Sequence, residues 1–155
     1  MKELIQVYKD LDKYYTKDHI AEICVEAMIR KSPFDLKDYL FIEPSAGSGA
    51  FIDAASAKGL NIKGFDLLPT RDDVIKNDFL SGNIDDFLSE EDRSKKKITI
   101  GNPPFGRKSG LGIEFLNRSL EQSDFVGFII PNQFEKWSVQ SKINPNAKLI
   151  ANIVL

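Results

Sequence analysis

The 155-residue sequence contains one cysteine, Cys24, and one histidine, His19. A single cysteine excludes a disulfide within the chain, and the two residues together provide no cluster with the spacing of a metal site. Apolar runs extend over only a few residues, far short of the roughly 20 that a membrane-spanning helix needs. The N-terminal stretch MKELIQVYKDLDKYY is charged throughout and lacks the apolar segment of a secretory signal. These absences predict a cytoplasmic protein that has no metal site and no membrane attachment.

The length and composition are those of one globular domain. Hydrophobic residues make up 42% of the chain and charged residues 28%. No repeat, low-complexity segment or linker divides the chain, so residues 1–155 are expected to form a single domain. Within it we expect an N-terminal helical element in residues 1–30 and a sheet core in residues 39–155.

The charge is unevenly distributed, although the net charge is only −2. Residues 1–92 have a balance of −8 and residues 93–155 a balance of +6. The positive share begins at Arg93–Lys97 and includes Arg107 and Lys108. Two interpretations stay open, a surface that binds phosphate groups and an ordinary solvated basic face.

Helices and strands are expected to alternate along the chain. Apolar spacing predicts a helix that Thr16 caps and that extends to Lys31, followed by further helices. These further helices are expected at residues 49–59, 82–93, 112–123 and 134–143. Short apolar runs predict strands at residues 39–44, 61–66, 73–78, 97–101, 125–131 and 148–155. This alternation is typical of an α/β fold, a mostly parallel, doubly wound sheet with helices on both faces.

A glycine-rich turn, EPSAGSG at residues 43–49, joins the first strand to the next helix. In a doubly wound sheet, this is where a nucleotide-like ligand binds. No Gly-Lys-Ser/Thr follows, and Ile52 occupies the third glycine position of a dinucleotide fingerprint, so neither phosphate motif fits. Glu43 would repel a pyrophosphate, whereas it suits a ligand that carries a cationic amino group. The alternative is a tight turn with an incidental acid.

Two further acids end the second and third strands. Asp66 is placed to accept hydrogen bonds from ribose hydroxyls, and Asp78 to accept from an adenine amino group, with Phe79 packing near the ring. Each acid taken alone is more often a strand-end cap. Together with Glu43 they favour an adenosine site.

The fourth strand ends in NPPF, residues 102–105. Two prolines stop the strand and hold Asn102 and Phe105 stiffly at its tip. With YYT at residues 14–16 and the glycine turn, this motif resembles the S-adenosylmethionine-dependent amino-methyltransferases that act on adenine in nucleic acid. The order of the three motifs is similar to the gamma arrangement of the DNA adenine methyltransferases, and the resemblance spans residues 14–137.

The resemblance implies a Rossmann-like class I methyltransferase fold, and it leaves open that the last strand or strands are missing. It implies S-adenosylmethionine as cofactor and assigns site residues by their motif positions. The implied cofactor-binding residues are Tyr15, Thr16, Glu43, Pro44, Ser45, Ala46, Gly47, Gly49, Asp66, Leu67, Asp78, Phe79 and Asn102. The implied catalytic residues are Asn102, Pro103, Pro104 and Phe105. Lys17 departs from the family, which usually has proline there.

The NPPF tip suits an amine that is a poor nucleophile. If the Asn102 side-chain oxygen and the Pro103 carbonyl each accept one N–H of the target amine, its nitrogen becomes more nucleophilic. The same acceptors stabilise the positive charge that develops as the methyl group arrives. Phe105 offers a face on which the extruded target base can stack. No general base or metal is needed, because the sulfonium is already activated.

Residues after the tip suggest contacts with nucleic acid. Arg107 and Lys108 lie in a glycine-containing loop that either contacts phosphates or forms an ordinary connection. Phe134 and Trp137 could stack on bases, but we expect both to cover the core.

The resemblance favours DNA as the substrate and leaves alternatives open. RNA methyltransferases also carry NPPF, and protein glutamine methyltransferases usually have tyrosine at the position of Phe105. A non-catalytic subunit that needs a partner is a fourth interpretation. No target-recognition domain is seen in the sequence, so a partner subunit or a further C-terminal region would supply it.

Overall fold

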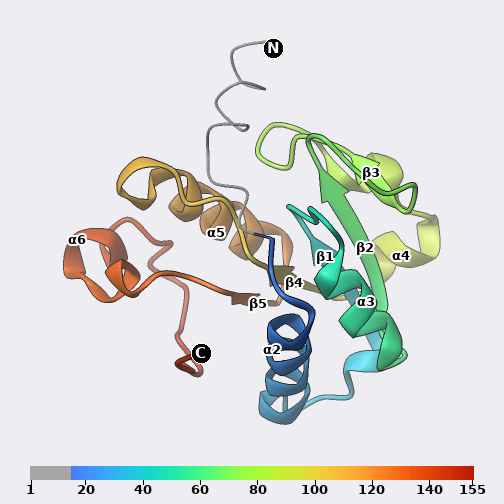
Figure 1. Cartoon of the computed structure of the whole chain (residues 1–155), viewed down its shortest axis with the longest axis horizontal. Coiled ribbons are helices and arrows are strands. Elements are labelled where there is room, and N and C mark those ends of the chain that lie inside the picture. The colour runs from blue at the N-terminus through green and yellow to red at the C-terminus, as the bar shows by residue number, and fades with distance from the viewer. Residues whose placement is uncertain (1–14) are drawn as a thin grey trace.

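The computed structural model describes residues 15–155 (Figure 1), so Tyr14 and the rest of residues 1–14 lie outside the described part. The α-helices are α2 (Asp18–Lys31), α3 (Ala50–Ala57), α4 (Glu90–Ser94), α5 (Gly110–Gln122) and α6 (Trp137–Gln140). Short 3₁₀ helices occupy Leu36–Asp38, Ile84–Phe87, Arg107–Ser109 and Asn132–Glu135. The strands are β1 (Leu40–Glu43), β2 (Asn61–Asp66), β3 (Val74–Lys76), β4 (Lys97–Gly101) and β5 (Phe125–Phe128).

The five strands form one sheet in the order β3-β2-β1-β4-β5, and every neighbouring pair is parallel. The central strand β1 is buried along its whole length, as its apolar run predicts. The expected α/β fold with a parallel sheet is therefore confirmed.

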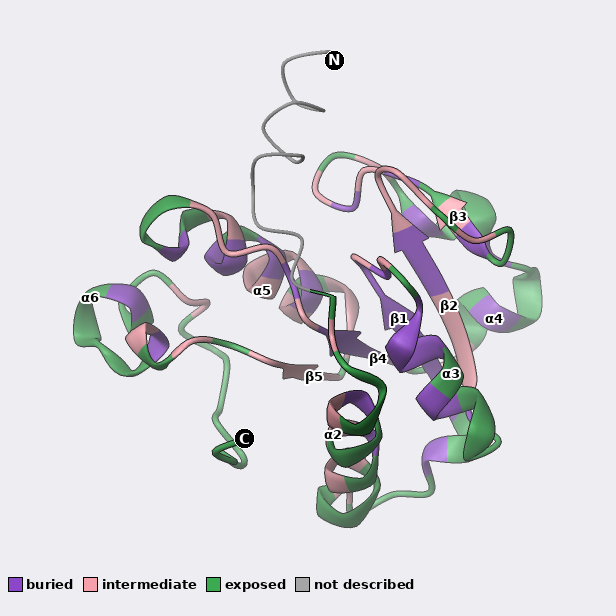
Figure 2. Ribbon diagram, viewed as in Figure 1, coloured by how far each residue is buried: buried purple, intermediate pink, exposed green. Residues whose placement is uncertain are grey.

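Both faces of the sheet are covered by helices, because side chains alternate along each strand. Phe41 points into a core that α2 and α3 complete. Leu40 and Ile42 point the other way, into a core that Phe115 of α5 helps to form. Figure 2 shows the buried sides of α2, α3 and α5 turned toward the sheet.

The strand order reverses next to β1. Chain connections lead from β1 outward through β2 and β3, whereas β4 returns to the other side of β1 and β5 follows it. In open parallel sheets, such a reversal opens a crevice at the carboxyl ends of the two strands, where ligands bind. The ends of β1 and β4 are Glu43, the first residue of the glycine turn, and Gly101, the residue that precedes NPPF.

The first helix begins later than the sequence predicts. Helix α2 starts at Asp18, and its N-cap is Lys17, whose side chain makes no capping hydrogen bond. The backbone oxygen of Lys17 accepts from the N–H groups of Ile20 and Ala21. The prediction that Thr16 caps this helix is therefore wrong, because extended backbone at Lys17 separates the threonine from the first turn.

Several other expected elements also differ. Residues 148–155, all within the described part of the chain, form no strand and are exposed, because no neighbouring strand pairs with their apolar run. The helix expected at residues 82–93 is two short helices, because the Ser89 hydroxyl accepts from the Asp92 N–H at 3.1 Å and starts α4 anew. The helix expected at residues 134–143 is likewise two short helices, the 3₁₀ helix Asn132–Glu135 and α6. Strand β5 ends at Phe128, before the expected end at residue 131.

None of the helices in residues 15–155 has both the length and the apolar character needed to cross a bilayer.

Candidate functional site

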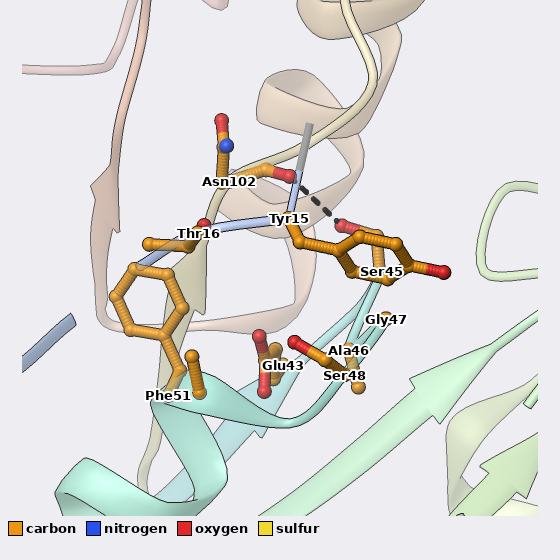
Figure 3. Close-up of a pocket in the computed structure, with 10 residues that line it drawn as sticks. Tyr15, Thr16, Glu43, Ser45, Ala46, Gly47, Ser48, Phe51 and Asn102 are labelled. Atoms are coloured by element: carbon orange, nitrogen blue, oxygen red, sulfur yellow. Dashed lines mark hydrogen bonds between the residues drawn. The ribbon is translucent and has the colours of Figure 1, made fainter. Parts of the chain in front are cut away.

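A small pocket lies at the crevice between the ends of β1 and β4 (Figure 3). Ten residues line it: Tyr15, Thr16, Glu43, Ser45, Ala46, Gly47, Ser48, Ala50, Phe51 and Asn102. Its empty space is about 270 Å³ when the part open to solvent is counted, and the enclosed part is much smaller. The pocket is therefore too small to enclose a ligand of ordinary size, and most of such a ligand would lie along the carboxyl ends of the strands.

Glu43 gives the pocket its electrostatic character. Its side chain is 2% exposed, and its Oε2 has no hydrogen-bond partner among the described residues. Burial raises the pKa of this carboxyl well above its ordinary value of 4.5, and the nearby Asp66 carboxylate raises it further. No lysine or arginine is among the lining residues that the described chain supplies. The pocket therefore supplies no cation for a phosphate, and it offers a buried carboxyl oxygen to a ligand group that donates hydrogen bonds.

Replacing Glu43 by glutamine is expected to stabilise the free protein at neutral pH. A carboxyl whose pKa is higher in the folded state binds its proton more tightly there, so stability is lost as pH rises from about 4.5 toward the folded pKa. Glutamine has no charge to bury. In thermal denaturation, Glu43→Gln should melt above the wild type at pH 7.5, and the difference should shrink toward pH 4.5. A difference that does not change with pH would contradict a buried, titrating Glu43.

The glycine turn is held in a conformation that ordinary residues disfavour. Gly47 has φ +53° and Gly49 has φ +85°, both in the left-handed region. A Cβ at Gly47 would lie 3.4 Å from the ring of Tyr15, so the tyrosine covers this turn (Figure 3). Gly49 is the N-cap of α3. Tyr15 and the turn thus lie against each other and line the same pocket, although Tyr15 itself stays 53% exposed.

Asn102 joins the pocket from the end of β4. Its backbone oxygen accepts from the Ser45 hydroxyl at 3.3 Å, which ties the NPPF tip to the glycine turn. Its side chain points away from Glu43 in Figure 3. The side-chain Oδ1 is buried and has no partner within residues 15–155. A buried acceptor without a partner costs free energy in the folded state, so this oxygen is available to a ligand that donates a hydrogen bond.

The other residues of the NPPF tip are anchored by packing. Pro103 is fully buried and Pro104 is half-buried. The ring of Phe105 packs edge-on against Phe134 at 6.3 Å between centroids, and the Phe105 carbonyl accepts from the Gly112 N–H at 3.2 Å. Packing therefore fixes the position of the Phe105 ring, which remains half-buried.

Asp66 and Leu67, at the end of β2, do not line the pocket, but Asp66 bonds the glycine turn that does. The Asp66 carboxylate accepts from the Gly47 N–H and from the Leu68 N–H, both at 2.8 Å. Asp66 therefore supports the glycine turn directly, and each of its oxygens keeps a further lone pair for a ligand. Pro44, the second residue of the turn, is buried.

Asp78 and Phe79 follow β3, one strand farther from the pocket, and do not line it. Asp78 accepts from the Leu80 N–H and the Ser81 hydroxyl, at 3.1 and 2.8 Å. Phe79 is 2% exposed, and its ring stacks on Phe115 in the core at 5.5 Å. The Phe79 ring therefore contributes to the core and presents almost no surface to a ligand.

The basic and aromatic residues beyond the tip differ in exposure. Arg107 and Lys108 are exposed, and Lys108 has φ +52°. Phe134 is buried, as expected. Trp137 is 81% exposed, so the expectation that it covers the core is wrong. It opens α6, a four-residue helix whose buried residue is Val139, and the tryptophan lies on the opposite, exposed side.

Sequence reasoning missed the loop between β2 and β3. Thr70 donates its hydroxyl to the Gly47 carbonyl at 3.2 Å, and Arg71 donates to the Ser48 carbonyl at the same distance. Neither residue belongs to a recognisable motif. Their roles depend on a contact between segments more than 20 positions apart, so no local signal in the sequence identifies them.

A search of protein-family models found no match to this chain, and no curated protein matches it.

Proposed function

We propose that this chain transfers a methyl group from S-adenosylmethionine to the exocyclic amine of adenine in DNA. One observation carries the proposal. Three separate segments, Tyr15–Thr16, the turn at 43–49 and Asn102, line one pocket at the strand-order reversal. Two of their polar atoms, Glu43 Oε2 and Asn102 Oδ1, are buried without partners in the described chain. These are the three segments whose motifs resemble the adenine amino-methyltransferases.

The pocket fits the methionine end of the cofactor. That end carries an ammonium group, and the buried oxygen of Glu43 lacks the donor that such a group would supply. Tyr15 and the glycine turn would enclose it, while Asp66 at the next strand end would accept from the ribose. Asp78 is proposed as the partner of the adenine amino group. When bound, the cofactor supplies an activated methyl group.

The chain's own contribution to the chemistry is the NPPF tip. Asn102 Oδ1 would accept one proton of the target amine and the Pro103 carbonyl another. Because Pro103 is buried and the Asn102 carbonyl bonds Ser45, these acceptors are held in place before the target arrives. Preorganised acceptors aimed at developing charge act mainly on the transition state.

Nucleic acid as the substrate rests on the surface beside the tip. Arg107 and Lys108 are exposed, two and three residues after Phe105, and can contact phosphates. The order of the three motifs favours DNA as the substrate. We also propose that the protein is cytoplasmic and that a further region or a partner subunit recognises the target.

S-adenosylmethionine is expected to bind the purified protein and raise its melting temperature, because a ligand selective for the folded state stabilises it by mass action. Titration calorimetry and thermal shift both test this. Reduced nicotinamide dinucleotide and ATP are the matched negative ligands, since the pocket lining supplies no cation for their phosphates. Absence of binding at millimolar cofactor would overturn the proposal.

A further inference from the structure

The guanidinium of Arg71 uses all five of its N–H groups within the protein. Nε and Nη2 donate to the two oxygens of Asp73 at 2.8 and 2.7 Å. Nη1 and Nη2 donate to the two oxygens of Asp53 at 2.8 and 2.9 Å. Nη1 also donates to the Ser48 carbonyl at 3.2 Å. Because an arginine has five donors, none is left for a phosphate or for a ligand carboxylate.

These five bonds connect three segments around the glycine turn. Asp73 precedes β3, Asp53 lies in the first turn of α3, and Ser48 belongs to the turn itself. Arg71 therefore fixes where the turn lies relative to the start of α3.

The position of Arg71 also explains why residue 49 is glycine. A Cβ at Gly49 would overlap the Arg71 side chain, whose Cζ and Cδ would be 2.7 and 2.9 Å away. The arginine therefore crosses directly over Gly49, which has φ +85°. Absence of a side chain at this position permits both the backbone conformation and the close approach.

Thr70 of the same loop and Asp66 at the end of β2 bond the other glycine of the turn, Gly47. Thr70 donates to the Gly47 carbonyl, and Asp66 accepts from the Gly47 N–H. Together with Arg71 on Ser48, the segment 66–71 holds the turn at two consecutive residues.

We propose that Arg71 is a positioning residue, which sets the glycine turn in its ligand-binding conformation without contacting the ligand. The inference rests on the proposed function for the identity of the ligand, S-adenosylmethionine. A merely structural ion pair at a partly exposed site contributes little to global stability. The effect of Arg71 should therefore appear in ligand affinity and in local order of the turn, and much less in melting temperature.

The test compares Arg71→Lys with Arg118→Lys. Lysine keeps the positive charge but cannot donate the five hydrogen bonds that the planar guanidinium of Arg71 donates. Arg118 is the control, because its side chain is 32% exposed against 28% for Arg71, and it pairs with the Glu121 carboxylate at 3.5 Å and donates to the Gly82 carbonyl. Calorimetry measures S-adenosylmethionine affinity, and hydrogen exchange measures protection of the Gly47 and Gly49 amides in the free protein.

We expect Arg71→Lys to weaken cofactor binding by about tenfold or more, because the turn must then be ordered on binding. It should also speed exchange at the two glycine amides, while both variants melt within a few degrees of the wild type. Wild-type affinity in Arg71→Lys would overturn the positioning role and leave the proposed function standing. If the wild type itself does not bind S-adenosylmethionine, the proposed function fails. Hydrogen exchange at the Gly47 and Gly49 amides then decides the role of Arg71. Faster exchange in Arg71→Lys than in the wild type supports that role, and unchanged exchange overturns it.

Discussion

Replacing Asn102 by alanine is expected to lower the single-turnover rate of methyl transfer by roughly 100-fold or more, the cost of losing one preorganised transition-state partner. The Asn102 side-chain oxygen is buried without a partner in residues 15–155, so its removal leaves no protein donor unpaired. Cofactor affinity should therefore change little, because the interaction forms with the reacting amine. Quenched single-turnover assays on an adenine-containing strand, with cofactor affinity measured in parallel, separate the two effects.

Two further variants serve as controls for Asn102. Asn102→Asp should lose less activity, because a carboxylate also accepts hydrogen bonds. Asn61→Ala removes an amide from the amino end of β2, the end away from the pocket, where it bonds Asp92 at 3.1 Å. It should transfer at the wild-type rate. A near-normal rate for Asn102→Ala would mean that the NPPF tip only supports the fold.

Removing the Asp66 carboxylate is expected to harm both stability and cofactor binding. Its two oxygens accept from the N–H groups of Gly47 and Leu68. Asp66→Asn keeps the shape, but its amide offers only one acceptor oxygen, so one N–H would face another donor. We expect a loss of about 1–3 kcal/mol in the free energy of unfolding from the unpaired group. S-adenosylmethionine should bind at least about tenfold more weakly, because the turn and the proposed ribose acceptor are both disturbed.

Denaturant unfolding and calorimetry of the same samples check the Asp66 prediction. Asp85→Asn is the control for charge, since Asp85 is an exposed acid on the 3₁₀ helix Ile84–Phe87. It should change neither quantity. Full stability in Asp66→Asn would show that the two backbone N–H groups find other partners, which would contradict the support that Asp66 gives to the turn.

The sheet could be predicted because its strands are short apolar runs that end in proline, glycine or an acid. Residues 40–43 and 97–101 are examples, and both are strands. The same pattern failed at residues 148–155, where an apolar run lies exposed without a neighbouring strand. Hydrophobicity of a segment indicates that it can form a strand, but pairing decides whether it does.

The site could be predicted where a motif occurs at a strand end, because parallel strands bring their carboxyl ends to one edge. Glu43, Gly47 and Asn102 were found in this way, and they line one pocket. Arg71 could not be found, since its partners come from three separate segments. The prediction that Trp137 covers the core was wrong for a related reason. An aromatic residue in a helical pattern is buried only if another element covers it.

Methyl transfer to the exocyclic amine of adenine in DNA can be detected with labelled cofactor. The protein is incubated with methyl-labelled S-adenosylmethionine and, separately, with DNA, RNA and protein pools, each followed by digestion and analysis of the labelled product. We expect label on the exocyclic amine of adenine from DNA, and its loss in Asn102→Ala. Label on glutamine, or cofactor binding without label on adenine in the DNA pool, would contradict it.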